Sequence, residues 1–142
     1  MTAPLSYRVV LDPNVLVSAA ITPMGTLGRV VSLVDSGIVV PIASQHLIDE
    51  VTDVLGRPKL RRYVDPEKAQ AFIAELGRLA EWHADPVDPP SLCRDPDDDY
   101  LLALAVLSRV DALVSGDQDL HALDNPGVDV ITPRVMLDRF SD

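Results

Sequence analysis

The sequence contains a single cysteine, Cys93, in 142 residues. One cysteine excludes an intrachain disulfide and a cysteine-rich zinc site, and it is typical of a protein from a reducing compartment. Aromatic residues make up only 4% of the chain, whereas 47% of the residues are hydrophobic. The core must therefore be built from aliphatic side chains, which favours an α/β or all-α fold over an aromatic-rich β-sandwich.

Long hydrophobic runs are also missing. No run approaches the roughly 18 apolar residues that a membrane span needs, and residues 1–5 lack the basic and apolar segments of a signal peptide. We therefore expect a soluble, cytoplasmic protein without membrane contact. The chain length predicts one domain over residues 1–142.

Positive charge is scarce, with 12 basic residues against 22 acidic ones and a formal net charge of −10. Taken alone, this balance argues against nucleic acid as a ligand, because phosphate binding is driven by neutralisation with cationic side chains. A cluster of carboxylates that recruits divalent cations is an exception, since the metal makes the site attractive to phosphate. Whether the acidic residues are spread out or concentrated therefore decides the interpretation.

Short runs of Val, Ile and Leu without alternation predict the strands of a parallel sheet that is covered on both faces. Amphipathic helical patterns lie between these runs. This alternation predicts a three-layer α/β/α fold with a central, mostly parallel sheet of four to five strands. The predicted strands are residues 8–11, 38–42, 112–114 and 128–131, and the predicted helices are residues 26–34, 44–55, 66–82, 96–109 and 134–140.

Acidic residues follow two of the predicted strands. Asp12 comes directly after the first strand, and Asp117 follows Ser115 and Gly116 after the third, with Asp119 close behind. Turn chemistry explains one carboxylate at a strand end. Two such carboxylates indicate a shared site, because ligands of open α/β sheets bind beyond the carboxyl ends of the strands.

Two predicted helices add further acids. On helix 44–55, Glu50 lies beside the edge of the buried face, whereas Asp49 and Asp53 point away from it. Helix 96–109 is apolar on every side and therefore buried, which holds its acidic first turn near the strand ends. Helical periodicity does not choose between Asp98 and Asp99 as the acid that faces the site.

Four segments resemble, in the correct order, the motifs of the PIN domain family. The likeness is closest to the toxin components of bacterial toxin–antitoxin pairs, such as the VapC-type ribonucleases. Each motif alone has low specificity, and the ordered set is specific. The segments are residues 9–19, 44–51, 95–105 and 114–120, which together span most of the chain.

The resemblance implies a metal-dependent ribonuclease. One Mg²⁺ or Mn²⁺ ion would activate water for attack on an RNA phosphodiester, and a second, about 4 Å away, would stabilise the leaving oxygen. Hard oxygen ligands select these ions over zinc. A cognate antitoxin and a homodimer are the implied protein partners. The implied catalytic metal ligands are Asp12, Glu50, Asp99 and Asp117, with Asp119 as a more variable ligand and with Asn14, Ser115 and Asp98 around them.

Pro13 departs from the family pattern, in which the residue after the first aspartate is usually Thr or Ser. Proline supplies neither a hydroxyl nor a backbone N–H group, so a hydrogen bond near Asp12 is expected to be missing. The alternative interpretation is a catalytically weak PIN-like module that binds RNA or has a regulatory role. Loss of turnover on chelation would identify the nuclease, whereas the module would bind RNA regardless.

A predicted loop before Tyr63 contains four of the twelve basic residues, namely Arg57, Lys59, Arg61 and Arg62. These side chains are candidates for contacts with RNA phosphates, with Tyr63 stacking on a base. A solvated loop explains them equally well. The three histidines are dispersed along the chain and predict no site.

Overall fold

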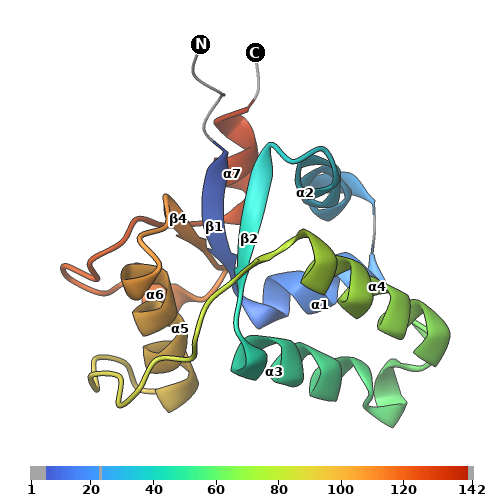
Figure 1. Ribbon diagram of the computed structural model, residues 1–142, viewed down its shortest axis with the longest axis horizontal. Helices are drawn as coiled ribbons and strands as arrows, with labels where there is room; N and C mark the ends of the chain where they lie inside the picture. Colours follow the sequence, from blue (N-terminus) through green and yellow to red (C-terminus); the bar gives the residue numbers. More distant parts are fainter. Residues whose placement is uncertain (1–5, 23, 141–142) are drawn as a thin grey trace.

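The computed structural model describes residues 6–22 and 24–140 (Figure 1). Strands and helices alternate along the described chain, as the sequence predicts. The elements are β1 (Tyr7–Leu11), α1 (Pro13–Ile21), α2 (Gly25–Asp35), β2 (Val39–Ala43), α3 (Gln45–Leu55), the 3₁₀ helix η1 (Pro58–Leu60), α4 (Pro66–Leu79), β3 (Glu81–Trp82), α5 (Pro96–Leu107), β4 (Ala112–Val114), α6 (Gln118–His121), β5 (Val130–Ile131) and α7 (Pro133–Asp138).

The strands form one parallel sheet in the order β3-β2-β1-β4-β5. β1 stands at the centre, where Val9 is in register with Pro41 of β2 and with Ala112 of β4. Because the pairs are parallel, the carboxyl ends of β1, β2 and β4 meet at one edge. The first residues after these strands therefore lie side by side.

Helices cover both faces of the sheet, so the predicted three-layer α/β/α fold is confirmed. Val9 and Leu11 belong to a core shared with α1, α2, α3, α4 and α7, whereas Val10 packs into a second core with α5 and α6. This division follows from the alternation of side chains along a strand. In Figure 1, α5 and α6 lie on one side of β1, and α1 to α4 lie on the other.

Four short elements were not predicted, namely α1, η1, β3 and α6. Helix α1 was not predicted, because the consecutive apolar residues Val15, Leu16 and Val17 obscure its short exposed face, which consists of Asn14 and Ser18. The helix predicted over 66–82 ends at Leu79, because the chain turns to pair β3 with the end of β2. Periodicity does not reveal a two-residue strand.

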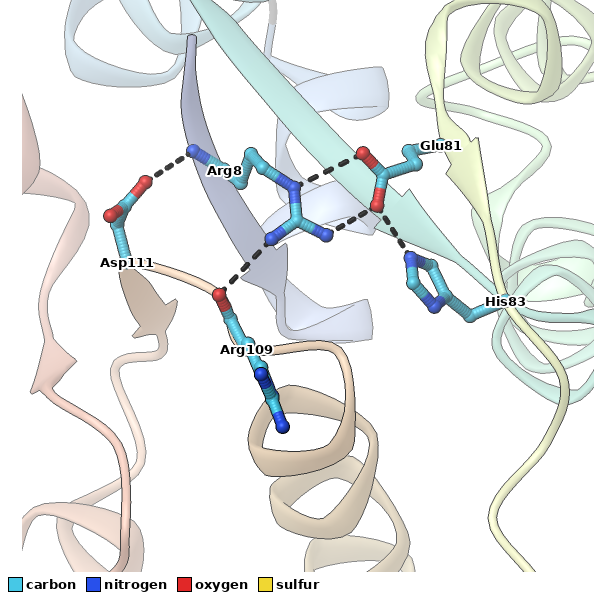
Figure 2. A network of polar contacts seen from close by, with 5 residues as sticks. All are labelled: Arg8, Glu81, His83, Arg109 and Asp111. Atoms are coloured by element: carbon cyan, nitrogen blue, oxygen red, sulfur yellow. Dashed lines mark hydrogen bonds and ion pairs between the residues drawn. The ribbon is translucent and has the colours of Figure 1, made fainter. Parts of the chain in front are cut away.

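A polar network connects β1, β3 and the turn before β4 (Figure 2). The Arg8 guanidinium on β1 donates to both oxygens of Glu81 on β3, and its Nη1 donates to the carbonyl oxygen of Arg109, 3.0 Å away. The Arg8 backbone N–H donates to Asp111 Oδ2 at 2.8 Å. Hydrogen bonds from Arg8 and then from His83 lower the pKa of Glu81 to about 2, against the effect of burial.

No single helix of residues 6–22 and 24–140 has the length and apolar character needed to cross a membrane. Helices α1 and α2 meet the requirements of length and apolar character only when they are taken together, and this pair is bent by 104°.

Candidate functional site

Asp12 directly follows β1 and is the N-cap of α1. Its Oδ1 accepts a hydrogen bond from the backbone N–H of Asn14 at 2.9 Å, as is usual for a capping aspartate. Its Oδ2 accepts one from the Ser115 hydroxyl at 2.7 Å. With 5% of its surface exposed, Asp12 is a nearly buried carboxylate whose orientation is fixed from two directions.

Ser115 connects the carboxyl ends of β1 and β4. The residue is fully buried, and its hydroxyl donates to Asp12 while accepting the backbone N–H of Asp117 at 3.0 Å. Nε2 of His121 lies 2.7 Å from the carbonyl oxygen of Ser115 and fixes the same turn from α6. These contacts set the position of Asp117 relative to Asp12.

Pro13 fits the site without leaving Asp12 unsatisfied. It occupies the first position of α1, where a backbone N–H would have no partner in the helix. The hydroxyl of Ser115, which follows the neighbouring strand β4, donates to Asp12. Whether Pro13 lowers the activity stays a question for experiment.

Asp98, in the first turn of α5, lies against Asp117 and Asp12. Burial, then the charges of Asp117, Asp95 and Asp12 and a hydrogen bond shared with Asp117, together raise the pKa of Asp98 to about 6. A carboxyl group with this pKa lies among like charges without a compensating cation. Three acids from three separate elements, Asp12, Asp98 and Asp117, therefore meet at the sheet edge.

Glu50 extends this cluster from α3. The side chain is half-buried, whereas Asp49 beside it is exposed, as the helical pattern predicts. Burial and the charges of Asp97 and Asp12 raise the pKa of Glu50, while His46 opposes them. We call the four acids Asp12, Glu50, Asp98 and Asp117 the carboxylate cup.

Asp99, which the resemblance places among the metal ligands, lies in different surroundings from the four acids of the cup. Its Oδ1 accepts the backbone N–H groups of Leu92 and Cys93 at 2.8 and 2.7 Å. Burial acts to raise its pKa, but these hydrogen bonds lower the pKa below its ordinary value. Asp99 holds the loop before α5, and Asp98, which we placed around the metal ligands, takes the position beside Asp117.

Tyr100 joins the beginning of α3 to α5. Its hydroxyl is hydrogen-bonded to the Oγ of Ser44, the N-cap of α3, and donates to Asp85 Oδ1 at 3.3 Å. Burial raises the pKa of Tyr100 to about 12, so the phenol stays protonated and can donate. The same Asp85 oxygen accepts the backbone N–H of His46 at 3.2 Å. Glu50 is thereby placed on a helix whose start is fixed against α5.

The other predicted residues lie around the cup or away from it. Asn14 and Asp119 are exposed, and the backbone N–H of Asp119 donates to Asp117 Oδ1 at 2.9 Å. Arg57, Lys59, Arg61 and Arg62, which we call the basic segment, are exposed beyond the carboxyl end of α3. This end lies about 16 Å along the helix axis from the first residue of α3. Arg57 pairs there with Asp53 at 3.4 Å.

The donor set of the cup fits a hard divalent cation. It consists of carboxylate oxygens, and every ion pair found among the described residues lies elsewhere in the molecule. Mg²⁺ and Mn²⁺ prefer such oxygens. Cys93, next to the cup, is no competing soft ligand at neutral pH, because burial and then the neighbouring carboxylates raise the pKa of its thiol to about 12.

Sequence reasoning assigned no role to His46 or Asp97. One signal was available, because His46 and Glu50 are four residues apart and share one face of a helix. The approach of Asp97 to this pair comes from the packing of α5 beside α3, which no local pattern reveals.

Comparison with known proteins gives one family match. A family model described as "PIN domain" matches residues 8–119. The chain is 28% identical over 145 residues to the uncharacterized protein MJ1680 of Methanocaldococcus jannaschii, covering 96% of this chain and 93% of that protein.

Two solved structures share the fold. One is a chain of the structure described as "VapBC2 from Rickettsia felis bound to a DNA fragment from their promoter". It superposes with a TM-score of 0.62 and is 12% identical, and the match covers 87% of this chain and 96% of that one. PAE2754 from Pyrobaculum aerophilum superposes with a TM-score of 0.63 and 17% identity, covering 94% of this chain and 88% of that one.

Proposed function

Since the chain belongs to the PIN domain family, we propose that it is a metal-dependent endoribonuclease that hydrolyses RNA phosphodiester bonds. PIN domains are generally nucleases. The observation that carries the proposal is the carboxylate cup, in which the pKa values of Asp98 and Glu50 are raised by burial and by neighbouring acids. Such crowding is costly unless a cation neutralises it.

Asp12, Asp98 and Asp117 are the residues that would hold the ion, with Glu50 at the border of the cup. A bound Mg²⁺ or Mn²⁺ would polarise the scissile phosphate and lower the pKa of an attacking water. The protein's own contribution is orientation. Asp12 is held by Ser115 and by the backbone of Asn14, so its carboxylate does not have to reorganise when the ion enters.

The substrate must approach an acidic protein, and the basic segment after α3 is the part of the surface suited to receive it. We propose that Lys59, Arg61 and Arg62, all exposed, contact phosphates of an RNA strand whose scissile bond lies at the cup. Tyr63 is 58% exposed beside them and offers a stacking surface.

A toxin role is the finer proposal. The fold likeness to a chain of VapBC2 supports a partner protein that blocks the cup. A cationic side chain of such an antitoxin would be attracted by the cup, because none of the ion pairs found among residues 6–22 and 24–140 neutralises its carboxylates. We further propose that the single domain acts in the cytoplasm and forms a homodimer, which the molar mass in solution would test.

The experiment is cleavage of single-stranded RNA by purified protein with Mg²⁺ or Mn²⁺, before and after chelation. Asp12→Asn and Glu50→Gln should each lower the rate at least 100-fold. Asp49→Asn is the matched control, because Asp49 is exposed on the same helix as Glu50, and it should cleave like the wild type.

Equal cleavage by all four proteins would reject the cup as the active site. RNA binding without turnover, unchanged by chelation, would instead support the catalytically weak module.

A further inference from the structure

One imidazole and two carboxylates meet at the border of the carboxylate cup. His46 and Glu50 lie one turn apart on α3, and Asp97 reaches them from the first turn of α5. One ligand atom of each lies within 4.8 Å of those of the other two. A nitrogen donor thus joins two carboxylates, of which only Glu50 belongs to the carboxylate cup.

The spacing suits one metal ion. Donors bound to a single octahedral ion at about 2.1 Å lie about 3 to 4.2 Å apart, so small side-chain rotations would bring these three atoms onto one ion. The group is open on its outer side, because His46 and Asp97 are exposed while Glu50 is half-buried. The remaining coordination positions are therefore accessible to water or to a phosphate oxygen.

The imidazole of His46 is already held in place. Its ring packs against the ring of Tyr100, with centroids 4.2 Å apart and planes tilted by 54°. The backbone N–H of His46 donates to Asp85, which also accepts the Tyr100 hydroxyl. A ligand that is oriented before the ion arrives loses little conformational freedom on binding.

We propose that His46, Glu50 and Asp97 form a second cation site, which selects Mn²⁺ or another transition metal over Mg²⁺. Imidazole nitrogen binds transition metals well, whereas Mg²⁺ prefers oxygen ligands and retained waters. Glu50 lies between this site and the carboxylate cup and is the one residue they share. The mixed site therefore sets the metal preference of the protein, in addition to the ion held by the cup.

The test is binding of Mn²⁺ alone, without RNA, followed by electron paramagnetic resonance. Pulsed spectra of the wild type should show coupling of the Mn²⁺ electron spin to a ¹⁴N nucleus. The informative variant is His46→Phe, because phenylalanine keeps the ring that packs on Tyr100 and removes the nitrogen donors. It should lose the ¹⁴N coupling and lower the Mn²⁺ affinity of this site at least tenfold, with little change in Mg²⁺ affinity.

His83→Phe is the control, since His83 lies with Glu81 in the Arg8 network, and it should retain the coupling. Absence of ¹⁴N coupling in the wild type, or its persistence in His46→Phe, would overturn the proposal. An equal loss of Mg²⁺ and Mn²⁺ affinity in His46→Phe would overturn the claimed selectivity.

Asp98→Asn separates this inference from the proposed nuclease. It removes a cup ligand but none of the three donors, so cleavage should be lost while the ¹⁴N coupling remains. Cleavage without any nitrogen coupling would leave the nuclease standing and reject the second site.

Discussion

Asp98 and Asp99 are consecutive residues of α5, yet their carboxylates lie in different surroundings. Asp98 shares a hydrogen bond with Asp117, whereas Asp99 accepts the backbone N–H groups of Leu92 and Cys93. Successive side chains on a helix point about 100° apart. One aspartate therefore faces the carboxylate cup, and the next one secures the loop that leads into the helix.

Asp98→Asn should stabilise the metal-free protein and should abolish the stabilisation of the protein by Mg²⁺. The pKa of Asp98 rises from 3.8 to about 6 on folding, so its contribution to stability is complete below pH 3.8 and is lost as the pH rises through 6. At pH 7 the variant should gain about 1 kcal/mol in free energy of unfolding, after allowance for solvent screening.

Urea unfolding at pH 7 and at pH 4 measures this gain, which should disappear at the lower pH. Saturating Mg²⁺ should raise the melting temperature of the wild type but not of the variant. A wild type that is already as stable as Asp98→Asn at pH 7 without metal would contradict the crowding of the cup.

Asp99→Asn should destabilise the protein and leave its Mg²⁺ binding nearly unchanged. The variant keeps the shape of the side chain but replaces the charged acceptor of two backbone N–H groups with an amide, so it should lose about 1 to 3 kcal/mol of stability. Mg²⁺ binding, followed by calorimetry, should stay within a few-fold of wild type. Loss of metal binding in a folded Asp99→Asn protein would restore Asp99 as a ligand.

Ser115→Ala removes the hydroxyl that joins Asp12 to the turn before Asp117. Because both partners are buried or half-buried, we expect a loss of about 1 to 3 kcal/mol. Metal affinity should also fall about 10- to 100-fold, the usual effect of a residue that orients a ligand. Ser108→Ala is a control at another buried serine, whose hydroxyl oxygen has no hydrogen-bond partner among the described residues; it should leave metal affinity unchanged.

Glu81→Gln tests the Arg8 network at low pH. The pKa of Glu81 falls from 4.5 to about 2 on folding, so the stability it contributes is present above pH 4.5 and is lost as the pH falls toward 2. Since the side chain is 40% exposed, the variant should lose only about 1 kcal/mol at pH 6. Acid titration of the unfolding free energy should show a smaller loss for Glu81→Gln than for the wild type.

The double variant Arg61→Ala, Arg62→Ala tests the basic segment. If these side chains neutralise phosphates, RNA affinity should fall and its dependence on salt should become shallower by about one contact for each arginine. Binding to a labelled single strand at several salt concentrations measures both quantities. An unchanged dependence of RNA affinity on salt would identify the segment as a solvated loop. The double variant Lys68→Ala, Arg78→Ala on α4 is the control for the change in net charge.

Much of the fold was predictable because the central strands contain unbroken apolar runs. The residues 8–11 and 112–114 were placed correctly as strands on that basis. Several helices also begin with a proline that follows a clear N-cap residue. Helix α1 escaped although Asp12 and Pro13 give it the same kind of start, because three consecutive apolar residues, Val15 to Val17, obscure the exposed face of Asn14 and Ser18. Strand β3 escaped because two residues contain no pattern. Pairing partners, and not the local sequence, create such short strands.

The candidate site was less predictable than the sheet. Asp12 and Asp117 follow from strand ends, which parallel pairing must bring to one edge. The choice between Asp98 and Asp99 depends on the rotation of α5, and that rotation is set by the packing of Tyr100 against Ser44 and His46. The proximity of His46 to Asp97 depends on the same contact between helices.

The central position of β1 delays the completion of the sheet while the chain is being made. β1 reaches its final surroundings only when residues 112–114 have been made, because β4 completes one of its edges. A nascent chain that carries Asp12 and Glu50 still lacks Ser115 and Asp117. We therefore expect translation intermediates that end before residue 115 to lack the complete carboxylate cup, and with it the proposed ribonuclease activity.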